Sequence, residues 1–304
     1  MNNKGFLALT SALLAIFVWG ISFVSTKIIL RELPPVTIAF FRQFIALVPL
    51  VIMMAVKKES FRIKKGELIL FVLSSLFGIV LYFLLENSGL VLISASNASL
   101  LVAAIPIFAL IADAIAGRKK INFQSLVCIV TSVAGVYFIT FECKAPDFKS
   151  ESFLGSLLIF GSMLSWIIYT FISERLSKNY SSLKLTTIQT ILSIPLFIPF
   201  VSGELNKWIM PSTIAFLNLI FLGVFCSALA YVFFLFGLQK LGPVLVSALL
   251  NLIPVITIIA EAIIIKEMIS IHQAVGSAMI LGSIFYLSLI GLKKDRDNEV
   301  PVKS

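Results

Sequence analysis

Long runs of hydrophobic residues recur along the whole chain, and charged or turn-forming residues separate them. A helix needs about 20 apolar residues to cross a bilayer, and the breaks between the runs leave ten segments near that length. We therefore predict ten transmembrane helices, near residues 6–30, 36–56, 68–90, 94–116, 122–141, 153–174, 183–201, 212–237, 243–265 and 270–291. The connections 91–93 and 238–242 are the least clearly marked breaks.

The composition is that of a membrane protein. Of the 304 residues, 59% are hydrophobic and 13% are charged, and the mean hydropathy is +1.06. An ordinary soluble domain has about 25% charged residues. Because the apolar runs cover the chain almost to its end, we expect an all-α polytopic membrane protein without a separate soluble domain.

The positive charges predict the orientation. The net charge of +9 does not indicate a nucleic-acid partner, because the Lys and Arg residues lie in short connections between apolar runs. With the N-terminus inside, 17 of the 24 basic residues fall on the cytoplasmic side. Five fall outside, namely Arg31, Lys144, Lys149, Lys207 and Lys266. The positive-inside rule therefore predicts a protein of the cytoplasmic membrane with both termini in the cytoplasm.

The second half of the chain repeats the first. The segment IPIFALIADAI at 105–115 parallels IPVITIIAEAI at 253–263, and Trp19 matches Trp166. Such self-similarity is typical of a duplicated unit, here one of five spans. We expect one five-helix repeat over 6–141, a second over 153–291, and a cytoplasmic tail over 292–304.

Because five is an odd number, the two repeats are expected to be inverted relative to each other. Inverted repeats give two conformations of similar energy, which is the basis of alternating access in carriers. Pro106 and Pro254 cannot donate to the carbonyls four residues before them. They predict either hinges that line a central cavity or static kinks that improve packing. Duplication within one chain removes the need for an antiparallel partner, so we expect a monomer.

Four ionisable residues fall at membrane depth in the outer half of the predicted spans, namely Lys27, Arg42, Glu86 and Glu261. A charge there costs about 2.5 to 3.5 kcal/mol on insertion scales, so such residues usually face a partner or a cavity. We expect Arg42 to pair with Glu86 or Glu261. Protonation of either carboxylate is a candidate means of coupling transport to a proton gradient.

Aromatic residues occupy matching positions in the two repeats. Trp19 and Trp166 lie in the first and sixth spans, while Tyr82 and Tyr231 lie in the third and eighth. Trp166 is 13 residues into its span, or about 20 Å, which is too deep for the aromatic belt at the membrane surface. The predicted substrate-binding residues are Trp19, Ser22, Tyr82, Glu86, Trp166, Tyr169, Tyr231 and Asn251.

Six short segments carry a family resemblance. They are AIFVWGISF at 15–23, MLSWIIYTF at 163–171, FFRQF at 40–44, the two Ile-Pro segments, and IIIKE at 263–267. With them the chain resembles the EamA-type family of the drug/metabolite transporter superfamily over nearly its whole length. The resemblance implies ten helices in two inverted halves that move small metabolites, often amino acids, often outward, and often with an ion or proton gradient.

The chain departs from this family at two positions. The Gly-Glu pair that usually closes the fourth and ninth spans is Gly117-Arg118 and Lys266-Glu267 here.

The leading functional hypothesis is a secondary carrier that exports a small polar metabolite such as an amino acid, with the substrate ammonium at Glu86. The alternative is a small organic cation such as choline, held by cation–π contacts to Trp19, Trp166 and Tyr82. An enzyme is not expected, because the chain contains no H-E-x-x-H, G-x-S-x-G or P-loop motif. The three scattered cysteines and the single histidine lack metal-ligand spacing, so we predict no metal and no cofactor.

Overall fold

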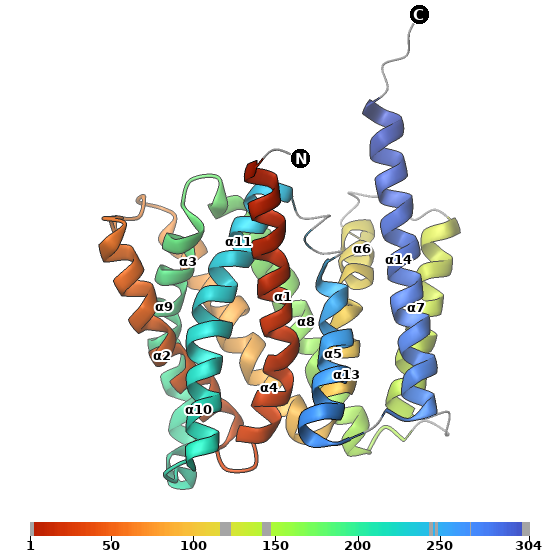
Figure 1. The fold of residues 1–304 in the computed structure, drawn as a ribbon, viewed down its shortest axis with the longest axis horizontal. Coiled ribbons are helices and arrows are strands. Elements are labelled where there is room, and N and C mark those ends of the chain that lie inside the picture. The colour runs from red at the N-terminus through yellow and green to blue at the C-terminus, as the bar shows by residue number, and fades with distance from the viewer. Residues whose placement is uncertain are drawn as a thin grey trace, which may run out of the picture.

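The computed structural model describes residues 3–115, 123–141, 147–242, 246, 249–267 and 269–299. All regular structure in this part of the chain is helical (Figure 1). The first half contains α1 (Asn3–Ile29), α2 (Pro35–Val56), α3 (Leu68–Ser75), η1 (Leu76–Leu81), α4 (Tyr82–Leu92), α5 (Ala95–Ala103), α6 (Ile105–Ile115) and α7 (Phe123–Phe141). The second half contains α8 (Glu151–Ser177), α9 (Ser182–Val201), η2 (Ser202–Lys207), α10 (Thr213–Phe221), η3 (Leu222–Leu229), α11 (Ala230–Leu241), η4 (Leu250–Leu252), α13 (Ile253–Ala260), η5 (Glu261–Ile265) and α14 (Ile271–Glu299).

Serine residues precede five of these helices. The side chains of Ser94, Ser150, Ser181, Ser212 and Ser270 accept hydrogen bonds from backbone amides three residues later, at the N-termini of α5, α8, α9, α10 and α14. The first amides of a helix have no partner within it, so a serine at this position contributes about 1 kcal/mol. These serines help to define where the chain re-enters helix after a turn.

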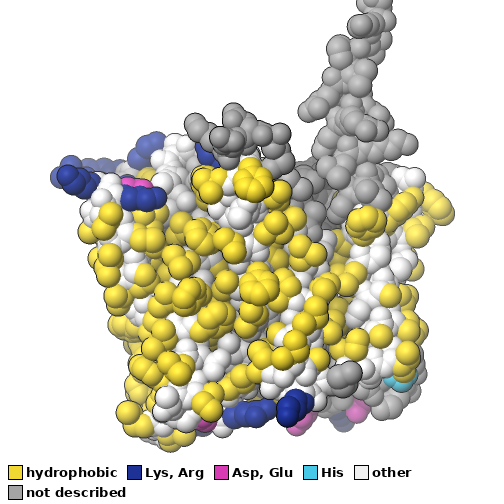
Figure 2. Space-filling view, in the orientation of Figure 1, with side chains coloured by type: hydrophobic (Ala, Val, Ile, Leu, Met, Phe, Trp, Pro, Cys, Tyr) yellow, Lys and Arg dark blue, Asp and Glu magenta, His cyan; other side chains and the backbone are white. Residues whose placement is uncertain are grey.

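The surface of the bundle matches a bilayer. Hydrophobic side chains cover its middle, and charged side chains gather at its two ends (Figure 2). Within the described residues, seven helical stretches are long and apolar enough to cross a membrane, namely Gly5–Ile29, Pro35–Val56, Leu68–Leu92, Phe123–Phe141, Glu151–Ser177, Ser182–Lys207 and Thr213–Leu241. The start of α1 and the end of α14 lie at the same end of the bundle (Figure 1). The protein is therefore a multi-pass α-helical membrane protein.

Two of the ten predicted spans are interrupted in the described residues. The helix predicted over 94–116 is divided at Ala104 into α5 and α6, and in the span predicted over 243–265 the 3-10 turn η4 precedes α13. The span predicted over 270–291 coincides with the first part of α14. Each of the ten predicted segments contains helix. Their arrangement as ten spans in two inverted repeats stays a prediction.

Helices from the two halves pack against each other in matching pairs. α1 contacts α11 and α13, while α8, the helix that matches α1 in the second half, contacts α4 and α5. Helices at equivalent positions also pair directly: α2 contacts α9, α5 contacts α13, and α7 contacts α14. The last pair stands side by side at one edge of the bundle (Figure 1). The interface between the two halves of the chain therefore lies at the centre of the molecule.

The third and eighth predicted spans each contain a π-helical segment. η1 separates α3 from α4, and η3 separates α10 from α11. π-Helical segments are rare and often mark functional positions within a helix. Tyr82 directly follows η1, and Tyr231 is the second residue after η3. Both tyrosines are buried.

The chain is interrupted at both Ile-Pro segments. A turn at Ala104 precedes α6, and the 3-10 turn η4 precedes α13, so Pro106 and Pro254 are each the second residue of a new helix. Proline suits the first turn of a helix, where its missing amide has no intrahelical partner to lose. The side chain of Pro106 lies outside the described residues. The hinge function of the two prolines stays a prediction.

Candidate functional site

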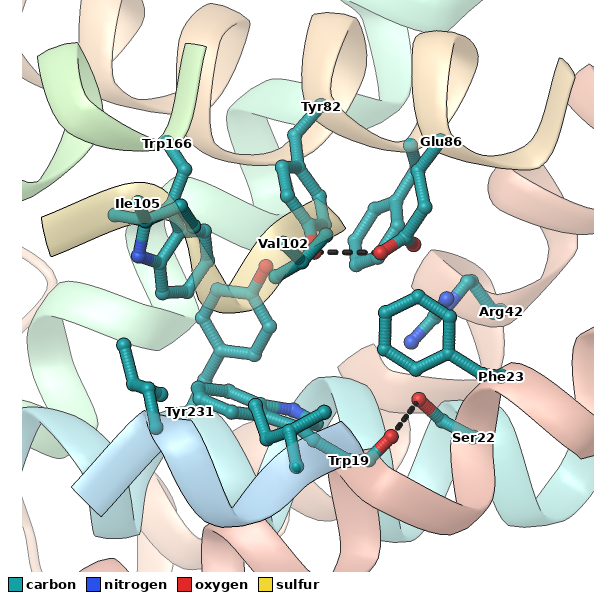
Figure 3. A pocket seen from close by; sticks show the side chains of 13 residues that line it. Trp19, Ser22, Phe23, Arg42, Tyr82, Glu86, Val102, Ile105, Trp166 and Tyr231 are labelled. Atoms are coloured by element: carbon teal, nitrogen blue, oxygen red, sulfur yellow. Dashed lines mark hydrogen bonds between the residues drawn. The ribbon is translucent and has the colours of Figure 1, made fainter. Parts of the chain in front are cut away.

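A cavity of about 30 Å³ lies between the two halves of the chain. The helices around it are α1, α2, α4, α5, α6, α8, α11 and α13, together with the turn η4. The residues that line it are Trp19, Ser22, Phe23, Arg42, Tyr82, Phe83, Glu86, Val102, Ile105, Trp166, Tyr231, Leu250 and Ile253 (Figure 3).

Many lining residues form pairs that the sequence repeat relates. The pairs are Trp19 with Trp166, Tyr82 with Tyr231, Val102 with Leu250, and Ile105 with Ile253. The last two pairs flank the interruptions next to the prolines. Equivalent elements of the two halves therefore approach the same space from opposite sides.

The paired aromatic rings contact each other across the interface. The ring centroids of Trp19 and Trp166 are 5.6 Å apart, with the ring planes at 90°. Trp19 lies 5.4 Å from Tyr231, and Trp166 lies 5.2 Å from Tyr82. Each tryptophan thus packs on the tyrosine of the other half. Aromatic pairs in such edge-to-face and tilted arrangements contribute about 0.5 to 1.5 kcal/mol beyond their buried area.

The π-helical segments η1 and η3 accept hydrogen bonds from these aromatic side chains. The Tyr231 hydroxyl donates to the carbonyl of Gly78 in η1 at 3.1 Å. The Trp19 indole Nε1 donates to the carbonyl of Cys226 in η3 at 3.0 Å. In hydrocarbon surroundings every backbone carbonyl needs a partner, so these bonds satisfy groups inside the irregular helices. They also fix the orientation of two rings in the cavity wall.

Glu86 supplies a carboxylate to the cavity. It is on α4, one helical turn after Tyr82, and its side chain is 6% exposed. The Tyr82 hydroxyl donates to Glu86 Oε1 at 2.5 Å (Figure 3). No described residue donates a hydrogen bond to Oε2. One carboxylate oxygen is therefore held by the protein, and the other is available to a ligand.

Arg42 supplies the opposite charge from α2, and its side chain is 2% exposed. Its Nε donates to the hydroxyl of Ser227 in η3 at 2.7 Å, and its guanidinium carbon lies 3.9 Å from the centroid of the Phe83 ring. The Nη groups donate to no described residue. Ser227 and Phe83 orient the guanidinium, and the NηH groups are left for a ligand.

The charges that were expected to pair do not meet within the described chain. Arg42 and Glu86 both extend into the cavity (Figure 3), but no ion pair joins them. Glu261 lies outside the cavity lining. Its two carboxylate oxygens accept hydrogen bonds from the backbone amides of Ala95 and Ser96 at 2.9 and 2.8 Å. That carboxylate caps α5, where the helix dipole favours a negative charge. The pairing of Arg42 with Glu261 is therefore absent.

Lys27 and Glu261 both bind the turn between α4 and α5. The Lys27 Nζ donates to the carbonyls of Leu90 and Ile93, at the end of α4, at 2.6 and 2.8 Å. A cation at the C-terminus of one helix and an anion at the N-terminus of the next both complement the helix dipoles. The two charges thus stabilise the turn between α4 and α5, which the sequence alone did not indicate.

Six of the eight predicted substrate-binding residues line the cavity, and two do not. Tyr169 lies behind the wall, with its ring 5.0 Å from that of Trp166 and 6.1 Å from that of Tyr231. Asn251 lies between two lining residues, Leu250 and Ile253, but is not itself part of the lining. The binding function of all eight residues stays a prediction.

Sequence reasoning missed several lining residues. Phe83, Val102, Ile105, Leu250 and Ile253 were not predicted to contact a substrate. The sequence repeat could have indicated the last four. Val102 and Leu250 are 148 residues apart, and so are Ile105 and Ile253, which is the separation of Pro106 and Pro254. Nothing in the sequence indicated the position of Phe83 beneath Arg42, since that contact depends on how α2 and α4 pack.

Comparisons with known proteins place this arrangement in context. The model of the EamA-like transporter family matches residues 6–141 and again residues 153–289. A protein of Archaeoglobus fulgidus named as an uncharacterized transporter is 30% identical over 277 residues, which are 90% of this chain and 95% of that protein. The uncharacterized transporter YcxC of Bacillus subtilis is 28% identical over 97% of each chain. A solved crystal structure with 16% sequence identity gives a TM-score of 0.68 and covers 93% of this chain and 98% of its own, a likeness of fold alone.

Proposed function

The chain belongs to the EamA-like transporter family, and from this premise we propose that it is a secondary active transporter for a small zwitterionic metabolite, an amino acid or a close analogue. The protein would export this substrate across the cytoplasmic membrane. The observation that carries the proposal is that Arg42 and Glu86 face one cavity with aromatic walls, and that each keeps polar atoms without a partner in the described chain.

The two charges suit the two ends of a zwitterion. A substrate carboxylate would accept hydrogen bonds from the Arg42 NηH groups, and a substrate ammonium would donate to Glu86 Oε2. The apolar part of the substrate would contact Trp19, Trp166 and Tyr82. A bound zwitterion compensates both buried charges at once, which matters because an uncompensated buried charge is strongly unfavourable.

The alternative substrate, an organic cation, fits the same aromatic walls less well. Its positive charge would contact the faces of Trp19 or Trp166. It would leave the Arg42 guanidinium without an anion and would add a second positive charge to the cavity. The charge of Arg42 therefore favours a zwitterion over choline and related cations.

Glu86 is the proposed point of proton coupling. Its carboxylate is at membrane depth, and the Tyr82 hydroxyl is its hydrogen-bond partner in the described chain. When the cavity is empty, a proton on Glu86 would neutralise the charge. An incoming ammonium group would replace that proton, which would leave to water on the side to which the cavity is open. Exchange of this kind would let inward proton flow drive outward substrate movement.

Alternating access between two inverted repeats is the proposed mechanism, in a chain that works as a monomer. It is supported by the matching helix contacts between the halves and by lining pairs such as Trp19 with Trp166. In inverted repeats each half can adopt the shape of the other, so the cavity opens to one side and then the other. The interruptions at Ala104 and at η4 would absorb the change in helix direction.

Counterflow in proteoliposomes tests the proposal. Liposomes loaded with unlabelled neutral amino acids should take up the labelled form with saturation, and choline should not compete. Arg42→Lys keeps the charge but loses the planar fork, so we expect the KM for amino acids to rise about ten- to a hundredfold, the equivalent of one lost charged hydrogen bond. The matched control is Arg31→Lys, at an exposed position between α1 and α2.

Glu86→Gln tests the coupling. It should remove the pH dependence of flux, and it should weaken substrate binding because the ammonium group loses its charged acceptor. If Glu86→Gln transports with unchanged pH dependence, coupling at Glu86 is wrong. If choline but no amino acid shows counterflow, the substrate class is wrong.

A further inference from the structure

The connection between α2 and α3 carries a dense group of positive charges. Lys57, Lys58, Arg62, Lys64 and Lys65 fall within nine residues, and all five side chains are exposed. We call these five residues the cationic platform. It lies at the end of the bundle where α1 begins and α14 ends, beside the belt of hydrophobic side chains (Figures 1 and 2).

The acidic residues near the platform are engaged elsewhere. Glu59 accepts a hydrogen bond from the hydroxyl of Ser181 at 2.5 Å. Glu67 accepts hydrogen bonds from the side-chain amide of Asn179 and from the hydroxyl of Tyr180. Among the described residues no ion pair neutralises a platform side chain. The platform therefore presents its positive charges to the surroundings.

The backbone of the platform is held in place by the turn between α8 and α9. The amide of Lys64 donates to the Tyr180 hydroxyl at 2.9 Å, and Lys184 Nζ donates to the carbonyl of Arg62 at 2.5 Å. The turn is itself anchored to α11, because Gln239 donates to the carbonyl of Tyr180 at 3.0 Å. A preorganised group of charges binds an anion with a smaller loss of entropy than a flexible one.

Exposed apolar side chains lie within and beside the platform. Val56, Phe61 and Leu68 are 76%, 49% and 53% exposed. A soluble phosphate or a nucleic acid would gain nothing from these residues. A partner with an anionic head and an apolar body uses both features, and the apolar surface of α2 ends directly at Lys57.

We propose that the cationic platform binds the phosphate groups of anionic phospholipids. Basic clusters beside a transmembrane helix attract anionic lipids, and the bonds that hold this platform rigid connect the two halves of the chain. A lipid bound there stabilises the conformation in which the α2–α3 connection and the α8–α9 turn are joined. The site is separate from the central cavity, so it does not depend on the identity of the transported substrate.

Thermal unfolding of the purified full chain in detergent tests the site. Phosphatidylglycerol should raise the unfolding temperature, whereas phosphatidylcholine with the same acyl chains and inorganic phosphate should not. In Arg62→Gln/Lys64→Gln/Lys65→Gln the phosphatidylglycerol needed for half of the effect should rise about tenfold or more. The matched control, Lys149→Gln/Lys207→Gln, removes exposed positive charges from other connections and should respond like the unmodified chain.

Several outcomes would overturn the proposal. One is an equal response to both lipids, and another is an unchanged response in the triple variant. An effect of inorganic phosphate alone would indicate a site for free anions instead. If the triple variant does not fold, Lys65→Gln alone should weaken the response, and added salt should weaken it in the unmodified chain by screening. If phosphatidylglycerol still raises the unfolding temperature fully in Lys65→Gln and at high salt, the platform is not the lipid-binding site.

Discussion

The indole rings of Trp19 and Trp166, which the sequence repeat relates, meet edge to face at 5.6 Å in the centre of the molecule. They are not equivalent in their hydrogen bonds, since only the Trp19 Nε1 donates to a described residue, the carbonyl of Cys226. The pair thus combines a repeat in the sequence with a local asymmetry in the structure.

This asymmetry gives a first prediction. Trp19→Phe leaves the carbonyl of Cys226 without its donor, which should cost about 1 to 3 kcal/mol, whereas Trp166→Phe removes a ring of the same size without that loss. Unfolding temperatures in detergent should therefore fall more for Trp19→Phe. Equal decreases for the two variants would show that the hydrogen bond does not contribute.

A second prediction concerns the close approach of η1 to α8. A methyl group added at Gly78 would lie 2.1 Å from a ring carbon of Tyr169, whereas a methyl group at Gly203 would meet no atom within 4 Å. Gly78→Ala should destabilise the protein by about 1 to 3 kcal/mol through overpacking, and Gly203→Ala should change stability by roughly 0.5 kcal/mol or less.

The same clash can be tested by rescue. Because Tyr169 is the residue contacted, Gly78→Ala combined with Tyr169→Leu should lose less stability than the sum of the two single changes. Strict additivity in unfolding measurements would contradict the contact.

A third prediction follows from the departure at the end of the ninth predicted span, where the chain has Lys266 in place of the glycine expected from the family. Lys266 has φ of 63° and ψ of 27°, the left-handed conformation that glycine adopts without strain. Lys266→Gly should therefore raise stability by roughly 1 kcal/mol. Lys207→Gly, at a position without positive φ, should not raise it. A lower unfolding temperature for Lys266→Gly would contradict the strain.

A fourth prediction concerns pH. Both the hydroxyl and the backbone amide of Ser212 donate hydrogen bonds to the Glu32 carboxylate. These bonds, the hydroxyl bond more than the amide bond, hold the pKa of the Glu32 carboxyl below its usual 4.5. A lowered pKa means that the charged form stabilises the folded state above pH 4.5, and that this stabilisation is lost as the pH falls through the lower folded value.

Unfolding temperatures measure this effect. Glu32→Gln should be less stable than the unmodified chain at neutral pH, and the difference should close as the pH falls below 4.5. The Glu151 carboxylate accepts no hydrogen bond from a described residue. Glu151→Gln should therefore lower the unfolding temperature at neutral pH by less than Glu32→Gln does. A difference for Glu32→Gln that persists in acid would contradict the assigned cause.

A fifth prediction tests the inverted layout. Single cysteines introduced at Lys58 and Lys178 should react with a membrane-impermeant reagent only from the cytoplasmic side, and those at Lys149 and Lys207 only from the outside. All four side chains are exposed. Labelling of Lys149→Cys and Lys178→Cys from the same side would exclude the proposed orientation of the sixth span.

Hydropathy and internal repetition, which are properties of the sequence, predicted an all-helical membrane protein, and six short segments predicted the family. The helices and the match to the EamA-like transporter family confirm those two predictions. They were accessible because a bilayer requires long apolar helices and because duplicated segments preserve residues at constant offsets. Trp19, Tyr82 and Trp166 lie at one cavity, and their function in substrate binding stays a prediction.

The partners of the charged residues were decided only by the tertiary structure. Sequence spacing placed Arg42, Glu86 and Glu261 at similar depth but gave no information on the rotation of each helix about its axis. Packing turns Arg42 and Glu86 toward the cavity and directs Glu261 to the amides of α5. An interaction of a buried charge depends on contacts of a few ångströms between segments far apart in the chain, and only the folded arrangement of the helices specifies those contacts.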